Sequence, residues 1–275
     1  MKVTIMGSAA AEAVPALWCE CAVCRKAKAN GGKDIRMRTS YLVDRDTLVD
    51  FGPDVFQQAL RFGFDWTQIR RIVFTHAHED HLNPVELLWR QSGFSLVKNR
   101  VKVIGSRRVL DRITRETRHS FDELQLDPME VRPGDKVTED DLSLQVLKAN
   151  HEDNCGQAVN YVFSRGGKNL LIANDTGWWE EAAWQQIAAW RLDAVIIDTT
   201  MGLAERFINW RDGHMGANVT VEFRDKLLQL GAITPDTPVC ANHFSHNGEI
   251  LHADLCAFFE PHRIMVGYDG MTLTL

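Results

Sequence analysis

The chain has 275 residues, 45% of them hydrophobic and 25% charged, so it can bury a substantial core. Its 31 basic and 37 acidic residues give a formal charge of −6, which argues against the broad basic surface that binds nucleic-acid polymers. No apolar run is long enough to cross a membrane and MKVTIMGSAA lacks the apolar core of a signal peptide, so we expect a cytoplasmic protein.

Short apolar, β-branched runs recur along the whole chain and predict many strands. We expect strands at residues 3–6, 40–43, 47–49, 72–74, 101–104, 142–147, 158–163, 170–173, 194–197, 238–241, 264–266 and 271–275. Helical periodicity marks residues 55–62, 84–91, 107–118, 178–190, 218–230 and 252–259. This order favours an α/β protein with two sheets packed face to face and helices outside, an αββα four-layer sandwich. No repeat or linker divides the chain, so we expect one domain over residues 1–275.

Near the start, WCECAVC places Cys19, Cys21 and Cys24 within six residues. The other three cysteines are scattered, which is not the pattern of a disulfide framework. Three thiolates at this spacing indicate a structural zinc site that lacks one ligand. His246 in NHFSH is the favoured fourth ligand, and Cys240 in a predicted strand is the competing candidate. Unligated thiols are the alternative; a redox pair is a poorer account because it leaves the third thiol unexplained.

A second cluster follows the strand predicted at residues 72–74. FTHAHEDHL supplies His76, His78, Asp80 and His81 within six residues. At a turn after a strand, His76 and His78 can reach one metal while Asp80 and His81 face a second position nearby. Imidazole and carboxylate ligands suit zinc, manganese or iron better than calcium or magnesium. A solvated polar loop is the alternative, and the density of histidines disfavours it.

Three further polar residues each follow a predicted apolar strand. They are His151 in KANHED, Asp175 in ANDTG and His243 in ANHFSH. Each of them alone could be a surface or capping residue. Because all three end strands, they can converge on one rim of the sandwich and complete a centre for two metal ions.

The HxHxDH motif and the later His, Asp and His resemble the signature of the metallo-β-lactamase superfamily. The resemblance implies an αββα fold with a dinuclear site. One metal would be held by His76, His78 and His151, the other by Asp80, His81 and His243, with Asp175 as the bridge. It also implies that Asp50 in TLVDFGPD braces the metal histidines, although a simple turn-forming role is equally compatible. Flavin-linked diiron relatives carry Glu where this chain has His78, which argues against an oxidoreductase.

A narrower resemblance covers nearly the whole chain. GSAAAEAVPALWCECAVCRKA, the loop from His243 to His246 and the ending VGYDGMTLTL resemble the phosphodiesterases related to the phosphoribosyl cyclic phosphate phosphodiesterase of the carbon-phosphorus lyase pathway. This resemblance implies a structural zinc on Cys19, Cys21, Cys24 and His246. It also places His214 of DGHMGANV near the phosphate, where a surface histidine in a loop is the alternative.

These residues lead us to expect hydrolysis of a small phosphodiester, such as a cyclic ribose phosphate or a nucleotide-like ester, by a water that two manganese or zinc ions activate. Asp175 would hold the metals apart, Asp80 would orient the nucleophile, and His214 would donate a proton or bind phosphate. Competing functions are a tRNA 3′-end endonuclease, a lactone or thioester hydrolase, and a metal-dependent binding protein without turnover. We expect no membrane or nucleic-acid polymer as partner, and a homodimer is compatible with the sequence.

Two arginines, Arg36 and Arg38, follow a pair of glycines and could meet a phosphate. Charged loop residues are usually solvated, and we expect that role for both of them.

Overall fold

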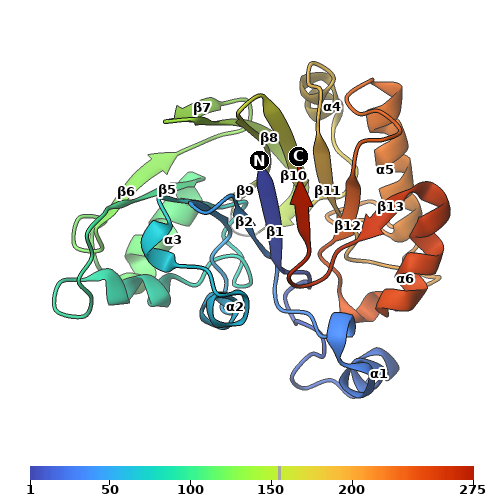
Figure 1. The fold of residues 1–275 in the computed structure, drawn as a ribbon, viewed down its shortest axis with the longest axis horizontal. Coiled ribbons are helices and arrows are strands. Elements are labelled where there is room, and N and C mark those ends of the chain that lie inside the picture. The colour runs from blue at the N-terminus through green and yellow to red at the C-terminus, as the bar shows by residue number, and fades with distance from the viewer. Residues whose placement is uncertain (154–155) are drawn as a thin grey trace.

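The computed structural model describes residues 1–153 and 156–275, which form two mixed β-sheets packed face to face (Figure 1). The first sheet has the strand order β14-β1-β2-β3-β4-β5-β6. Its strands are β1 (Lys2–Gly7), β2 (Ser40–Val43), β3 (Thr47–Val49), β4 (Arg71–Val73), β5 (Val101–Gly105), β6 (Leu126–Glu130) and β14 (Thr272–Thr274). The second sheet has the order β13-β12-β11-β10-β9-β8-β7. Its strands are β7 (Lys136–Glu139), β8 (Leu142–Asp153), β9 (Gly156–Arg165), β10 (Lys168–Ala173), β11 (Ala194–Asp198), β12 (Val239–Asn242) and β13 (Ile264–Val266).

Helices cover the outer faces of both sheets, as Figure 1 shows. The first sheet packs against α2 (Val55–Phe62) and α3 (Arg107–Thr117), and the second against α4 (Glu181–Ile187), α5 (Ala217–Gln229) and α6 (His252–Phe259). The N-terminal α1 (Ala22–Asn30) and the short 3₁₀ helices η1 (Gly32–Asp34), η2 (Trp66–Gln68), η3 (Pro84–Arg90), η4 (His246–Gly248) and η5 (Glu260–His262) lie in the connections. The predicted αββα sandwich is confirmed.

Strand side chains alternate between the inter-sheet core and the helix layers. In β10, Leu170 and Ile172 point between the sheets, whereas Leu171 points toward the helices on the outer face. Since both faces of this strand are covered, its sequence is a continuous apolar run without polar alternation. Each such side chain, when fully buried, stabilises the fold by about 1.5–3 kcal/mol relative to its exposed state.

Parallel pairing determines where the polar loops lie. Strands β3 to β6 pair in parallel within the first sheet, and β10 to β13 do so within the second. The carboxyl ends of parallel strands meet at one edge of a sheet. The turns that leave these strands therefore gather polar residues at one rim of the sandwich.

Several elements differ from the sequence prediction. Strands β6 and β7 were not predicted, because both are short and neither contains a run of buried apolar residues. Helix α1 was not predicted either, since its segment AVCRKAKAN is dominated by polar residues and cysteine. Residues 84–90 form a 3₁₀ helix rather than an α-helix. Among the described residues, no helix is long and apolar enough to span a membrane.

Arg36 is buried, contrary to the prediction that it is a solvated loop charge, with only 1% of its surface exposed. Its guanidinium donates to Ser8 Oγ at 2.9 Å and to the Gly267 carbonyl at 2.6 Å, and lies 4.6 Å from the ring centre of Phe244. Burial lowers the pKa of Arg36 to about 10, so the side chain remains a cation at neutral pH. It thereby ties the ends of β1 and β13 to the loop after β12.

Replacing Arg36 by Met should lower the free energy of unfolding by about 2–4 kcal/mol, because a buried carbonyl loses its donor and the buried Asp269 loses a nearby cation. Arg38 is the matched control: it pairs with Asp54 at 2.9 Å, and both side chains are 21% exposed. Arg38→Met should therefore cost less than about 1 kcal/mol. Urea denaturation of both variants checks this; equal losses would contradict the assigned role of Arg36.

Candidate metal centres

Sharp turns at the strand ends aim polar side chains at the rim. Asp50 follows β3, Asp175 follows β10 and His243 follows β12, and their φ angles are 61°, 47° and 65°. Few non-glycine residues adopt this left-handed conformation, which costs roughly 1–2 kcal/mol per residue. Such backbone persists only where the surrounding structure holds it in place, and it clusters at functional sites.

Three imidazoles form the first group at this rim. His76 and His78 lie in the turn after β4, and His151 belongs to β8 in the other sheet. His76 Nε2 lies 2.8 Å from His78 Nδ1, which in turn lies 3.2 Å from His151 Nε2. Each histidine offers one ring nitrogen that could bind a metal. These three nitrogens all lie within 4.8 Å of one another, as the ligands of one metal ion would.

A second group, composed of Asp80, His81 and His243, is buried beside the first. His81 Nε2 lies 3.1 Å from Asp80 Oδ2 and 3.4 Å from His243 Nε2. Asp80 and His81 come from the same turn as His76 and His78, whereas His243 follows β12 in the opposite sheet.

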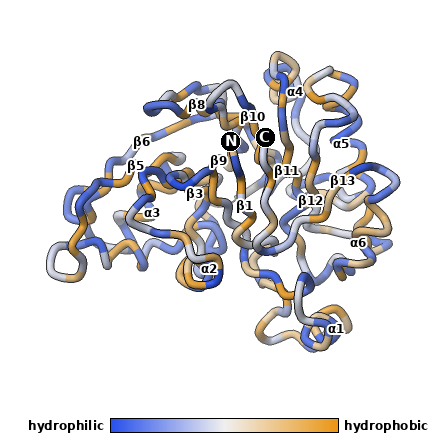
Figure 2. The backbone as a smooth tube through the Cα atoms, viewed as in Figure 1, coloured by the Kyte–Doolittle hydropathy of each residue, from blue (hydrophilic) through white to orange (hydrophobic). Residues whose placement is uncertain are grey.

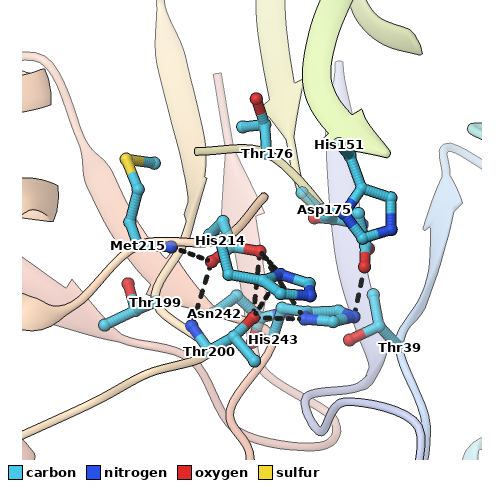
Figure 3. A network of polar contacts seen from close by, with 12 residues as sticks. Thr39, His151, Asp175, Thr176, Thr199, Thr200, His214, Met215, Asn242 and His243 are labelled. Atoms are coloured by element: carbon cyan, nitrogen blue, oxygen red, sulfur yellow. Dashed lines mark hydrogen bonds and ion pairs between the residues drawn. The ribbon is translucent and has the colours of Figure 1, made fainter. Parts of the chain in front are cut away.

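Asp175 lies where the two groups meet. Its Oδ2 is 3.1 Å from His81 Nε2 and 3.1 Å from His243 Nε2, and the residue also forms a ligand group with His76 and His81. This oxygen is buried and makes no hydrogen bond of good geometry. Figure 3 shows Asp175 between His151 and His243. A buried carboxylate oxygen facing imidazole nitrogens fits a divalent cation, so all seven predicted ligands lie in a suitable arrangement.

The electrostatics of the rim favour the metal-binding forms of three of these groups. At a fourth, His81, burial would lower the pKa, but the carboxylates of Asp175 and Asp80 outweigh it and raise the pKa, so a metal ion would have to displace a proton there. Burial would raise the pKa values of Asp80 and Asp175, but the neighbouring His81 and His243 outweigh it and hold both carboxyls below their usual range. Burial lowers the pKa of His76, with His81 adding to the effect, so that imidazole is neutral. Ionised carboxylates and neutral imidazoles are the forms that bind metals.

Asp50 braces this centre from behind. The residue is completely buried, and its Oδ2 lies 2.7 Å from His81 Nδ1. Its Oδ1 accepts from the backbone N–H of Thr75 at 2.8 Å, so the carboxylate is itself held in place. The contact turns His81 Nε2 toward the rim, which is the arrangement that the resemblance implied for this aspartate.

Asp198, at the end of β11, is a functional residue that the sequence analysis missed. It is fully buried, and its Oδ2 lies 3.0 Å from His214 Nδ1 and accepts from Thr200 Oγ1 at 2.9 Å. Since the Thr200 hydroxyl gives its only proton to Asp198, it accepts from His243 Nδ1 at 2.7 Å. One carboxylate thus orients two histidines. The signal was present, because IIDTT also places an aspartate at the end of an apolar strand.

His214 lies beside the two metal groups. Its ring is 4.8 Å from that of His151 and stacks on that of His243 at 5.7 Å. Burial would lower the pKa of His214, but the carboxylate of Asp198 outweighs this and raises the pKa to about 9. The imidazole therefore carries two protons at neutral pH, with Nδ1–H directed to Asp198 and Nε2–H available to a ligand.

A separate group near the N-terminus contains Cys19, Cys21, Cys24 and His246. His246 Nδ1 lies 3.6 Å from Cys19 Sγ and 3.5 Å from Cys21 Sγ, and Cys24 lies on the first turn of α1. The competing candidate Cys240 is buried in the inter-sheet core, apart from this group. Burial would raise the pKa of Cys21, but hydrogen bonds from Cys24 and His246 lower it to about 6. Three sulfurs and one imidazole nitrogen match the ligand set of a structural zinc.

Residues 45–231 match a family model described as the beta-lactamase superfamily domain. A curated relative, named octanoyltransferase, from Porphyromonas gingivalis (strain ATCC BAA-308 / W83) is 25% identical over 285 residues, which cover 98% of this chain and 51% of the relative. This chain thus spans about half the length of that relative.

Solved structures with the same fold cover the chain from end to end. Zn²⁺-bound PqqB from Methylobacterium extorquens is 20% identical with a TM-score of 0.77, and each chain is covered completely. A diphosphatase from the PhnP family is 21% identical with a TM-score of 0.76, covering 100% of this chain and 97% of that one. The short form of human tRNase Z is 16% identical with a TM-score of 0.69, covering 100% and 99%. Since the family model spans more than half of the chain, this protein belongs to the beta-lactamase superfamily.

Proposed function

We propose that this protein is a metal-dependent phosphodiesterase that hydrolyses a small phosphodiester, such as a cyclic ribose phosphate or a nucleotide-like ester. The superfamily and the facing His and Asp groups support a metal-dependent hydrolase. The finer proposal is carried by one observation: His214, which Asp198 orients and whose pKa that carboxylate raises, lies beside those groups.

We propose that the rim binds two manganese or zinc ions and that the cysteine group binds one zinc. At the rim, His76, His78 and His151 would hold one ion, Asp80, His81 and His243 the other, and Asp175 would touch both. When bound, these ions supply Lewis-acid catalysis for the attack of water on phosphorus.

The protein's own residues would hold the substrate and move a proton. Asp80 is ionised and lies at the second metal group, where it can orient the attacking water. His214 Nδ1–H is held by Asp198, so its Nε2–H can be given to the oxygen that leaves phosphorus. Asp198 is thus a positioning residue, because it acts through His214 and through Thr200 on His243.

Two alternatives act through the same metal groups. The first is a tRNA 3′-end endonuclease, since this chain shares the fold of human tRNase Z. The excess of acidic over basic residues in this chain disfavours an RNA polymer as substrate. Hydrolysis of a lactone or thioester needs the same ligands, and the curated relative named octanoyltransferase makes an acyl thioester a sensible competitor in the assay.

With metal-stripped protein reloaded with manganese or zinc, bis(p-nitrophenyl) phosphate should be hydrolysed, and Asp80→Ala should lower kcat/KM by about 10³-fold or more because the second metal loses a ligand. A lactone and an octanoyl thioester are assayed in parallel. A kcat/KM for the phosphodiester that is higher than for the lactone and for the thioester would support the proposal. Cleavage of the thioester or the lactone without cleavage of the phosphodiester would contradict the proposed substrate class but not the proposed metal centre.

His214→Ala should lower kcat by about 10²–10³-fold for a phosphodiester with an alkyl leaving group, but only a few-fold for p-nitrophenolate, which leaves without a proton. Asp198→Asn should show the same selectivity between the leaving groups, and any further loss in the double variant relative to His214→Ala measures the second action of Asp198, through Thr200 on His243. His119→Ala, a histidine outside the metal groups, is the control. Equal losses for both leaving groups would contradict the proton-donor role.

Cys21→Ser should release one zinc per chain and lower Tm by roughly 5–10 °C, because the loop around α1 loses its cross-link. Zinc content by mass spectrometry and thermal unfolding measure the two effects. Cys256→Ser, a cysteine outside the group, should change neither. Unchanged zinc content in Cys21→Ser would remove the thiol cluster from the proposed sites.

A further inference from the structure

A tyrosine hydroxyl is hydrogen-bonded on both sides inside the apolar core between the two sheets. Tyr41 of β2 is completely buried there, among apolar strands such as β10 and β11, whose hydrophobic residues are visible in Figure 2. Its hydroxyl donates to Asn174 Oδ1 and accepts from Asn242 Nδ2 at 2.9 Å. Burial raises the pKa of Tyr41, so the phenol keeps the proton that it donates. One hydroxyl of the first sheet thus holds two amides of the second.

Both amides belong to residues that directly precede proposed metal ligands. Asn174 follows β10 and precedes Asp175, and Asn242 ends β12 and precedes His243. Both ligands have positive φ angles, so the chain turns sharply at each of them. Strand β11 lies between β10 and β12, so no strand pairing joins the two turns directly. Tyr41 joins them through its hydroxyl.

The surroundings leave the phenol as the partner that fixes these amides. Asn174 and Asn242 are completely buried, and among the described residues their side chains hydrogen-bond only to Tyr41. The backbone carbonyl of Asn174 is held separately, because it accepts from Asn160 Nδ2 at 2.7 Å. Next to the other amide, a Cβ on Gly267 would lie 2.3 Å from Asn242 Oδ1, so only glycine leaves room for it. Loss of the hydroxyl would leave buried polar atoms unpaired on both amides.

We propose that Tyr41 is a positioning residue of the metal centre, which sets the separation of Asp175 and His243 through the two asparagines. Asp175 Oδ2 lies 3.1 Å from His243 Nε2, close to the ~3.3 Å that separates two ligands of a tetrahedral zinc ion. A small movement of either turn therefore changes whether both ligands reach the same ion. The inference rests on the proposed dinuclear centre and is independent of the substrate.

The three histidines of the first metal group come from β8 and from the turn after β4, so they do not depend on these asparagines. Tyr41→Phe should therefore weaken one of the two rim ions by about 10-fold or more, the usual effect of losing a residue behind the ligands, and the other by less than about 3-fold. Manganese is titrated into metal-stripped protein, and electron paramagnetic resonance measures the free ion. His243→Ala identifies which binding step belongs to the second group.

Hydrogen exchange of the metal-free protein gives a second readout that needs neither metal nor substrate. Two amides report on the turns: Gly177 donates to the Asn150 carbonyl at 2.8 Å, and Ser245 donates to the Thr200 carbonyl at 3.1 Å. Tyr41→Phe should lower the protection of both by about 10-fold. The amide of Leu82, which donates within the turn of the first sheet, should keep its protection.

Thr117→Val is the matched control, because it also removes a buried hydroxyl, one that donates to the Ile113 carbonyl at 2.7 Å within α3. It should leave both manganese affinities unchanged. Equal weakening of both ions in Tyr41→Phe, an unchanged affinity at the second group, or protection lost evenly over the molecule would each overturn the role of Tyr41. A single rim ion in the unmodified protein would overturn the dinuclear centre and this inference together, whereas a lack of phosphodiester turnover alone would contradict only the proposed function.

Discussion

The charge of buried Asp175 is the constraint on which the rim depends. Its carboxylate is 3% exposed and lies 3.1 Å from nitrogens of both His81 and His243. A charge in such a place is expensive unless it is matched by positive charge close by. Histidines from both sheets supply part of that match, and a bound divalent cation would complete it. The two sheets therefore meet around a buried polar centre whose charges fit a cation.

The histidines of this centre are oriented by hydrogen bonds to buried aspartates that lie behind them. Asp50 in the first sheet orients His81, and Asp198 in the second sheet orients His214 directly and His243 through Thr200. Both aspartates follow or end parallel strands, and both are fully buried. Each sheet thus contributes a rigid carboxylate whose position is fixed by strand pairing, so the histidines cannot turn away without breaking buried hydrogen bonds.

One short loop connects the rim to the proposed zinc site. His243 belongs to the rim and His246 to the cysteine group, and between them Phe244 packs under the buried guanidinium of Arg36. The opposite side of the rim is also supported by packing. Phe51, which follows β3 and Asp50, donates its N–H to the carbonyl of His81 at 2.8 Å, so the turn after β3 and the metal turn share a backbone hydrogen bond.

The sequence by itself determined the fold class and the types of ligand, because both depend on local patterns. Apolar runs marked the strands at the rim, and HxHxDH and CxCxxC concentrate metal-binding groups within a few residues. Only the tertiary structure paired Asp198 with His214, which lie 16 residues apart and meet because β11 ends beside the start of α5. Only packing decided that Arg36 is buried and that Phe56 and Leu96 are exposed. Burial depends on which surfaces the two sheets and their helices cover, and no local pattern carries that information.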